Sequence, residues 1–96
     1  MPELDDIQLE VEAWAEFNFP NTPQYRPLLG VGEEAGELMH AHLKMEQGIR
    51  TREDHEAKAK NAVGDLLIFL MHYCALRRWS MNDCLKKAWE EVKQRN

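Results

Sequence analysis

The chain has 96 residues, of which 44% are hydrophobic and 30% are charged, and its formal net charge is −5. This composition indicates a single folded domain over residues 1–96 and argues against a disordered chain. No apolar run approaches the ~20 residues that a membrane span requires, so we expect no membrane partner. The acidic balance disfavours a nucleic acid polymer as a partner, because nonspecific binding of a phosphate backbone needs a concentrated basic face.

The first ten residues, MPELDDIQLE, contain neither a basic leader nor an apolar signal core. We therefore expect no export signal and a cytoplasmic location. Cys74 and Cys84 are too few for a disulfide framework or a thiolate metal site, and both lie in apolar helical segments. Buried free thiols are expected at both positions.

Apolar residues recur at three- and four-residue intervals in four segments, which predicts four amphipathic helices. The predicted helices are one that ends before residues 19–23, one from about Pro27 to Gln47, a third and longest from Glu53 to Arg78, and one that Ser80 caps. No segment alternates with a period of two. The short connections predict an all-α, four-helix antiparallel bundle, and the many large apolar residues predict that it is oligomeric.

Three glutamates crowd one face of the second predicted helix. Glu33 and Glu37 are one turn apart, Glu34 and Glu37 are three residues apart, and all three lie within an arc of about 100°. At ~5 Å and an effective dielectric of about 20, each like-charged pair repels by ~3 kcal/mol, and by less where the side chains splay into water. The cluster predicts either a compensating cation or a solvated acidic face.

Asp65 interrupts the apolar run of residues 62–70 on the third predicted helix, whose middle we expect to be nearly enclosed. A carboxylate there is costly unless it binds a metal or pairs with a cation such as Arg26 or Lys44. Oxygen ligands without thiolates favour Mg²⁺ or Mn²⁺. Glycines inside the helical patterns indicate close approach of the two helices or of a ligand, and they are Gly30, Gly32, Gly36 and Gly64.

The four histidines do not form a metal-binding pattern. His40 and His42 lie on opposite faces of a helix, so no zinc site is expected. His42 shares the apolar stripe of the second helix and is expected in the core, whereas His55 and His72 follow no pattern. The sequence also contains no glycine-rich phosphate loop and no Ser/His/Asp or Cys/His constellation.

Together the acidic residues and their context resemble the all-α nucleotide pyrophosphohydrolases, specifically the MazG and MazG-like proteins, including compact members from phages and mobile elements. That family's pattern is EExxE on one helix and ExxD on the next, the latter inside a run similar to Gly-Asp-Leu-Leu-Phe. Here residues 33–37 complete the first half and residues 61–69 match the second. Where the family has the glutamate of ExxD, this chain has Ala62, and the adjacent Asn61 offers an amide oxygen without charge.

The resemblance, which covers roughly residues 4 to 92, implies hydrolysis of a (d)NTP, with dGTP as a candidate, to the (d)NMP and pyrophosphate. It implies Mg²⁺, replaceable by Mn²⁺, and a homodimer or homotetramer. The metal ligands and catalytic residues that it implies are Glu33, Glu34, Glu37 and Asp65. Candidates for contacts with the phosphates or with metal-bound water, from their helix faces, are Lys44, Lys58 and Asn61. Candidates for contacts with the base are Trp14, Phe17, Asn18 and Tyr25, with a place in the hydrophobic core as the alternative for the three aromatic residues.

Two other functions remain as alternatives. A nucleotide- and metal-binding module with weak or no turnover is favoured by Ala62 and Asn61, because neither supplies the missing carboxylate. A helical interaction protein would use the acidic cluster only as a solvated surface.

Overall fold

A computed structural model of the chain describes residues 3–48 and 52–95. Within these ranges the protein contains no strand and is all-helical, as predicted, with α1 (Leu4–Asn18), α2 (Tyr25–Gln47), α3 (His55–Leu76) and α4 (Met81–Arg95). The prediction that the third helix is the longest is wrong, because α2 has 23 residues and α3 has 22. Neither helix, nor any other in the described ranges, is long and apolar enough to cross a membrane.

Local residues account for the helix ends. Gly48 ends α2 in the left-handed region at φ 66°, where its amide donates to the carbonyl of Lys44 at 3.1 Å. Asp54 caps α3 by accepting a hydrogen bond from the amide of Ala57 at 2.9 Å. Ser80 precedes α4, and its hydroxyl oxygen accepts from the amide of Asp83 at 3.1 Å, which confirms the predicted cap.

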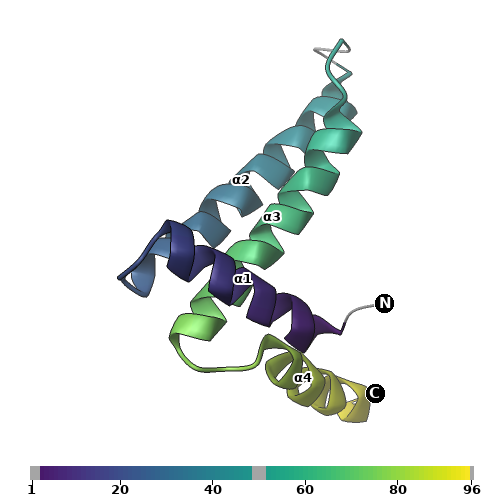
Figure 1. Ribbon diagram of the computed structural model, residues 1–96. Helices are drawn as coiled ribbons and strands as arrows, with labels where there is room; N and C mark the ends of the chain where they lie inside the picture. Colours follow the sequence, from purple (N-terminus) through teal and green to yellow (C-terminus); the bar gives the residue numbers. More distant parts are fainter. Residues whose placement is uncertain (1–2, 49–51, 96) are drawn as a thin grey trace.

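The four helices form an open arrangement around a long hairpin. α2 and α3 run antiparallel side by side, α1 packs across α3, and α4 lies beside the start of α1 (Figure 1). The buried Gln8 side chain of α1 holds this last corner, since Nε2 donates to the Trp79 carbonyl at 2.7 Å and Oε1 accepts from the Met81 amide at 2.9 Å. One amide group thus satisfies two backbone groups of the turn and places the start of α4 against α1.

The buried core is small and lies where α1, α3 and α4 meet. It consists of Met71, Cys74 and Met81, surrounded by the partly buried residues Leu4, Ile7, Val11 and Leu70. Cys74 is buried as predicted, but Cys84 is exposed, so the prediction of a buried thiol there is wrong. The reason is that α4 is buried at Met81 in its first turn, while Cys84 and the turns beyond it lie outside the core.

Much of the apolar surface of the hairpin remains uncovered. Val63, Leu67 and Ile68 of α3 are between 40% and 46% exposed, so the prediction that the middle of this helix is nearly enclosed is wrong. The apolar spacing correctly identifies a helix, but α1 covers only part of α3. The accessible surface of 7511 Å² is accordingly about 1,800 Å² larger than the roughly 5,700 Å² expected for a compact monomer of this size.

Gly30 is the glycine at which packing leaves no room for a side chain. A Cβ atom at this position would lie 2.5 Å from Cδ1 of Phe69, so the aromatic ring of α3 packs directly on the α2 backbone. The corresponding positions at Gly32, Gly36 and Gly64 have no neighbouring atom within 4 Å. Close approach of the two helices therefore explains Gly30 but not the other three glycines.

We expect Gly30→Ala to lower the melting temperature measured by circular dichroism. Overpacking against Phe69 costs about 1–3 kcal/mol, which offsets or exceeds the roughly 1 kcal/mol that alanine contributes as a better helix former. Gly32→Ala is the matched control on the same helix and should stabilise by about 1 kcal/mol. Phe69→Leu in the Gly30→Ala background should recover part of the loss. Equal stability of the two alanine variants would show that the ring yields without cost.

Candidate functional site

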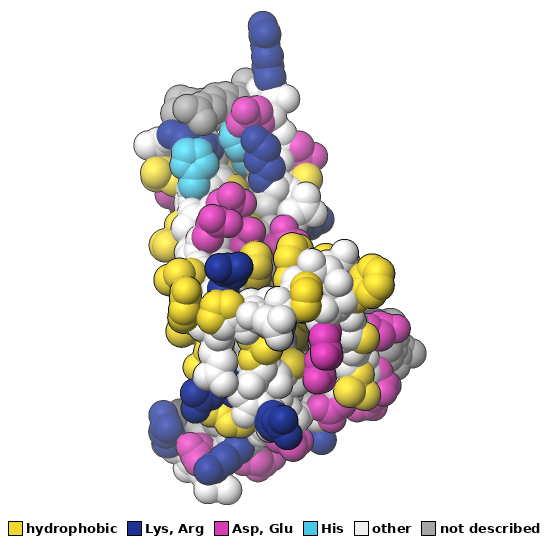
Figure 2. Space-filling view, turned by 60° about the vertical axis from the view of Figure 1, so that its left-hand side comes forward, with side chains coloured by type: hydrophobic (Ala, Val, Ile, Leu, Met, Phe, Trp, Pro, Cys, Tyr) yellow, Lys and Arg dark blue, Asp and Glu magenta, His cyan; other side chains and the backbone are white. Residues whose placement is uncertain are grey.

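Acidic side chains gather on the face of the α2–α3 hairpin. Figure 2 shows an acidic patch on this face. Histidine and basic side chains lie on its side toward the turn that follows α2, and hydrophobic side chains lie on its other side. Glu33, Glu34 and Glu37 project from α2 and Asp65 projects from α3. Their charges interact, because Glu37, Asp65 and Glu33 each act electrostatically on Glu34. We call these four residues the carboxylate cluster.

Glu34 is the buried member of the carboxylate cluster, with 8% of its surface exposed. Its Oε2 atom is buried and has no hydrogen-bond partner within residues 3–48 and 52–95. Burial raises the pKa of Glu34, and repulsion by Glu37, Asp65 and Glu33 and a side-chain hydrogen bond with Glu37 raise it further. The folded chain therefore holds a carboxylate in surroundings that favour a proton or a cation beside it.

Oxygen donors of this kind fit a hard cation such as Mg²⁺. The unpartnered Oε2 atom of Glu34 fits one as well, because a cation would compensate both its burial and its repulsion. In residues 3–48 and 52–95, however, no three His, Cys, Asp or Glu side chains already stand in an arrangement that could hold a metal ion. Glu33 and Glu37 are exposed, so rotation of their side chains is the movement that ligation would require.

The interpretation of Asp65 as a buried charge is wrong. Its side chain is exposed, since α1 leaves this part of α3 uncovered. Among the described residues, no ion pair joins Asp65 to Arg26 or to Lys44. The position of Asp65 is nevertheless informative, because it lines two neighbouring cavities.

One of these cavities, with a volume of about 560 Å³, is largely apolar. Its apolar wall comes from the end of α1, the start of α2 and the middle of α3, and includes Trp14, Phe19, Pro27, Ile68 and Phe69. Its polar lining consists of Thr22, Arg26, Glu34, Asp65 and His72. We call this space the aromatic cavity. Its size and lining suit a flat organic ring with a few polar edges.

The second cavity, of about 660 Å³, is polar and lies between α2 and α3. Its acidic lining includes Glu33, Glu37 and Asp65, and its other polar residues are His40, Glu53, His55, Lys58 and Asn61. We call this space the polar cavity. The carboxylate cluster thus stands at the boundary of the two cavities, with Glu34 on the aromatic side, Glu33 and Glu37 on the polar side, and Asp65 on both.

The structure places some of the predicted base-binding residues at a cavity and others away from it. Trp14 lines the aromatic cavity and packs edge-on against Phe19, with ring centroids 5.6 Å apart. Asn18 lies outside that lining, and its amide donates to the Trp14 carbonyl at 2.8 Å. Phe17 is 87% exposed, and Tyr25 is exposed as well. Of the four candidates, Trp14 is therefore the one that the fold places at a cavity.

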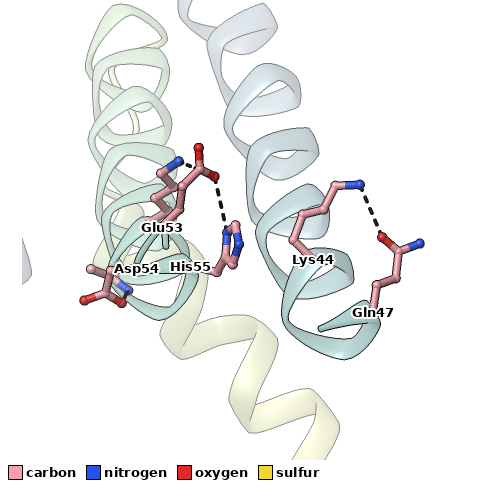
Figure 3. Close-up of polar contacts among 7 residues, drawn as sticks. Lys44, Gln47, Glu53, Asp54 and His55 are labelled. Carbon is pink, nitrogen blue, oxygen red and sulfur yellow. Dashed lines mark hydrogen bonds and ion pairs between the residues drawn. The ribbon is translucent and has the colours of Figure 1, made fainter. Parts of the chain in front are cut away.

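The predicted phosphate contacts are likewise divided. Lys58 and Asn61 line the polar cavity. Lys44 is outside that lining and donates to Oε1 of Gln47 at 3.2 Å, one turn along the same helix (Figure 3). Ala62, at the position where the resembled family has a glutamate, is 2% exposed and packed between the helices of the hairpin.

Sequence reasoning missed several residues of the two cavities. His40 and His55 line the polar cavity, and His72, whose pKa is lowered by burial, lines the aromatic cavity. Phe69 and Arg26 were not recognised as cavity residues either. Their spacing carries no motif, because they come together only when α2 and α3 pair.

The prediction that His42 lies in the core is wrong. His42 is exposed, with Nε2 3.1 Å from Oε1 of Glu46.

No protein-family model, curated protein or solved structure matches this chain. The functional interpretation below therefore depends on the residues of the site and their chemistry.

We expect Glu34→Gln to raise the melting temperature of the metal-free protein at pH 8. Because the pKa of Glu34 is raised in the folded chain, its ionised form lowers stability progressively as the pH rises through that pKa. The gain from the neutral amide should be largest above neutral pH and should disappear toward about pH 4, where the carboxyl group is protonated. Thermal unfolding in chelator across this pH range measures both effects.

Glu10→Gln on α1 is the matched control, because Glu10 is exposed and this substitution removes the same formal charge as Glu34→Gln. It should change the melting temperature little at any pH. If Glu34→Gln behaves as this control does, the carboxylate cluster is solvated and imposes no electrostatic strain.

Proposed function

We propose that the chain is a MazG-like, metal-dependent nucleotide pyrophosphohydrolase that converts a (d)NTP into the (d)NMP and pyrophosphate. The observation that carries this proposal is the buried Glu34 carboxylate, whose Oε2 atom has no hydrogen-bond partner among the described residues. It lies beside three other carboxylates at the boundary between an aromatic and a polar cavity. An aromatic space beside a polyanion-handling site is what a nucleoside triphosphate requires.

The electrostatics of the site support a cation as an obligatory partner. A chain of net charge −5 with four carboxylates at the cavity boundary would repel a triphosphate. In the proposal, Glu33, Glu34, Glu37 and Asp65 hold Mg²⁺ or Mn²⁺. Such an ion, when bound, supplies charge neutralisation at the phosphates and lowers the pKa of a bound water.

In the proposal, different residues of the chain contact different parts of the substrate. The aromatic cavity accepts the base, with Trp14 and Phe69 offering ring faces and Arg26 offering hydrogen-bond donors to the base edge. Lys58 and Asn61 face the phosphates from the polar cavity. Attack of water on the α-phosphorus breaks its bond to the bridging oxygen of the β-phosphate, and a carboxylate of the cluster accepts the proton of the water.

A second candidate function has a specific observation in its favour. Ala62 is buried where the resembled family places a carboxylate, and the neighbouring Asn61 is exposed and neutral. A site with one acidic ligand fewer would bind nucleotide and metal but turn over slowly. This alternative is a nucleotide-binding module built on the same two cavities.

The proposal predicts release of pyrophosphate from at least one member of a (d)NTP panel that includes dGTP, in the presence of Mg²⁺ or Mn²⁺. Glu37→Gln and Asp65→Asn should each lower kcat/KM at least about a hundredfold, the scale of loss when one group aimed at the transition state is removed. Chromatographic identification of the monophosphate checks the cleavage position. Glu46→Gln is the control, because Glu46 pairs with His42 outside both cavities.

The alternatives give different results in the same samples. Nucleotide with Mg²⁺ that raises the melting temperature without product would favour the binding module, since a ligand specific for the folded state stabilises it by mass action. Neither product nor a thermal shift with any nucleotide would leave a helical interaction protein.

We also propose that the chain self-associates. Its radius of gyration is 15.8 Å, against roughly 12.5 Å expected for a compact domain of this length. The surface excess of about 1,800 Å² per chain is the amount that one partner loses in a large, permanent interface. Exposed apolar side chains are available on both the hairpin and α4, and include Leu29, Leu43, Leu67, Leu85 and Trp89.

Light scattering coupled to size exclusion should therefore give a mass of at least two chains. Replacing an apolar contact by a buried charge is strongly unfavourable, so Leu67→Lys on α3 or Trp89→Lys on α4 should lower that mass. Glu10→Lys, at an exposed polar position of α1, should leave it unchanged. A monomeric wild-type chain at micromolar concentration would contradict this proposal.

A further inference from the structure

The polar cavity has two chemically different ends. Glu33, Glu37 and Asp65 supply carboxylates at one end. Because α2 and α3 run antiparallel, the later residues of α2 lie beside the earlier residues of α3, and there the lining changes to His40, His55 and Lys58 together with the carboxylate of Glu53. Figure 2 shows histidine and basic side chains beyond the acidic patch, with further acidic side chains among them. The cavity therefore runs from an end with three carboxylates to an end where one carboxylate lies among hydrogen-bond donors, which we call the donor end.

Glu53 lies close to both Lys58 and His55 at the donor end. Its Oε2 atom lies 3.1 Å from Nζ of Lys58 and 3.9 Å from Nδ1 of His55. His55 is only 7% exposed, and its ring points from α3 toward α2 with the Glu53 carboxylate beside it (Figure 3). The Glu53 carboxylate therefore forms an ion pair with the Lys58 ammonium and lies near the buried His55 imidazole at the same wall of the cavity.

The position of Asp65 gives a bound nucleotide a direction. Asp65 lines the aromatic cavity on one side and the polar cavity on the other. A nucleotide whose base occupies the aromatic cavity must therefore extend its phosphates past Asp65 toward Lys58, which lies two helical turns before Asp65 on α3. The end of the phosphate chain farthest from the base then reaches the donor end.

We infer that Lys58 and His55, positioned by Glu53, form a subsite for the β- and γ-phosphates, which leave together as pyrophosphate. The inference rests on the proposed hydrolysis for the identity of its substrate. Lys58 is suited to this role because its ion pair with Glu53 is partly exposed and hence weakly held, so the ammonium can turn to a more highly charged phosphate. His55 contributes an N–H donor from a buried position, and Glu53 is a positioning residue.

The test compares inhibition by the two products. In steady-state assays with Mg²⁺, His55→Gln and Lys58→Met should each raise the inhibition constant of pyrophosphate about tenfold, the loss expected for one hydrogen bond to a charged group. The inhibition constant of the nucleoside monophosphate should stay within about twofold, because that product lies on the other side of the cleavage point. A purely structural role for His55 would weaken both products alike.

Lys60→Met is the matched control, since Lys60 is an exposed lysine of the same helix outside the lining of both cavities. It should leave both inhibition constants unchanged. If His55→Gln fails to fold, Lys58→Met still tests the subsite, because the Lys58 side chain is 57% exposed and its replacement leaves the core unchanged. An unchanged constant for pyrophosphate in Lys58→Met, or equal weakening of both products, would overturn the subsite.

Calorimetric titration of magnesium pyrophosphate separates this inference from the proposed function. A wild-type chain that hydrolyses nucleotides but binds pyrophosphate no better than Lys58→Met would overturn the subsite and leave the function standing. A chain that hydrolyses no nucleotide, yet binds pyrophosphate about tenfold more tightly than Lys58→Met, would overturn the function and support a polyphosphate subsite at this position.

Discussion

Burial of the Glu34 carboxylate beside Glu33, Glu37 and Asp65 is an electrostatic conflict that the fold creates and does not itself resolve. Burial and repulsion both raise the pKa of Glu34, and in the part of the chain that the structure describes its Oε2 atom has no hydrogen-bond partner. An ionised carboxylate in such surroundings costs free energy unless a proton or a cation compensates it. A cation compensates the charge without neutralising the oxygen donors, and this makes the carboxylate cluster suited to the handling of phosphates.

Pairing of α2 with α3 places the carboxylate cluster at the boundary of the two cavities. The hairpin brings Asp65 opposite the glutamates, and the same pairing opens the polar cavity on one side of them. The end of α1 then supplies Trp14 to the aromatic cavity on the other side. Gln8 lies outside the lining of both cavities, and its two hydrogen bonds hold α4 against α1 at the small core. Each cavity thus depends on contacts between helices rather than on any single motif.

The uncovered apolar side chains and the proposed chemistry are connected. Water screens charges in an open cavity, whereas a cavity closed by a partner would strengthen every interaction between the carboxylates, the cation and the phosphates. Exposure of Leu67 and Ile68 next to Asp65 means that a second copy on this side of the hairpin would lie close to the site. Self-association would therefore affect the electrostatics of the site as well as the stability of the chain.

The helices and the grouping of acids could be predicted from the sequence, because both depend on spacing along one segment. Three-to-four-residue periodicity located all four helices, Ser80 marked the start of the last helix correctly, and the spacing of Glu33, Glu34 and Glu37 put them on one face. The burial of Glu34 and the exposure of Asp65, His42 and Cys84 depend on how the helices pack, as does the position of His55 with Lys58 at the polar cavity. Periodicity specifies which residues share a face of one helix, whereas burial depends on which other helix covers that face.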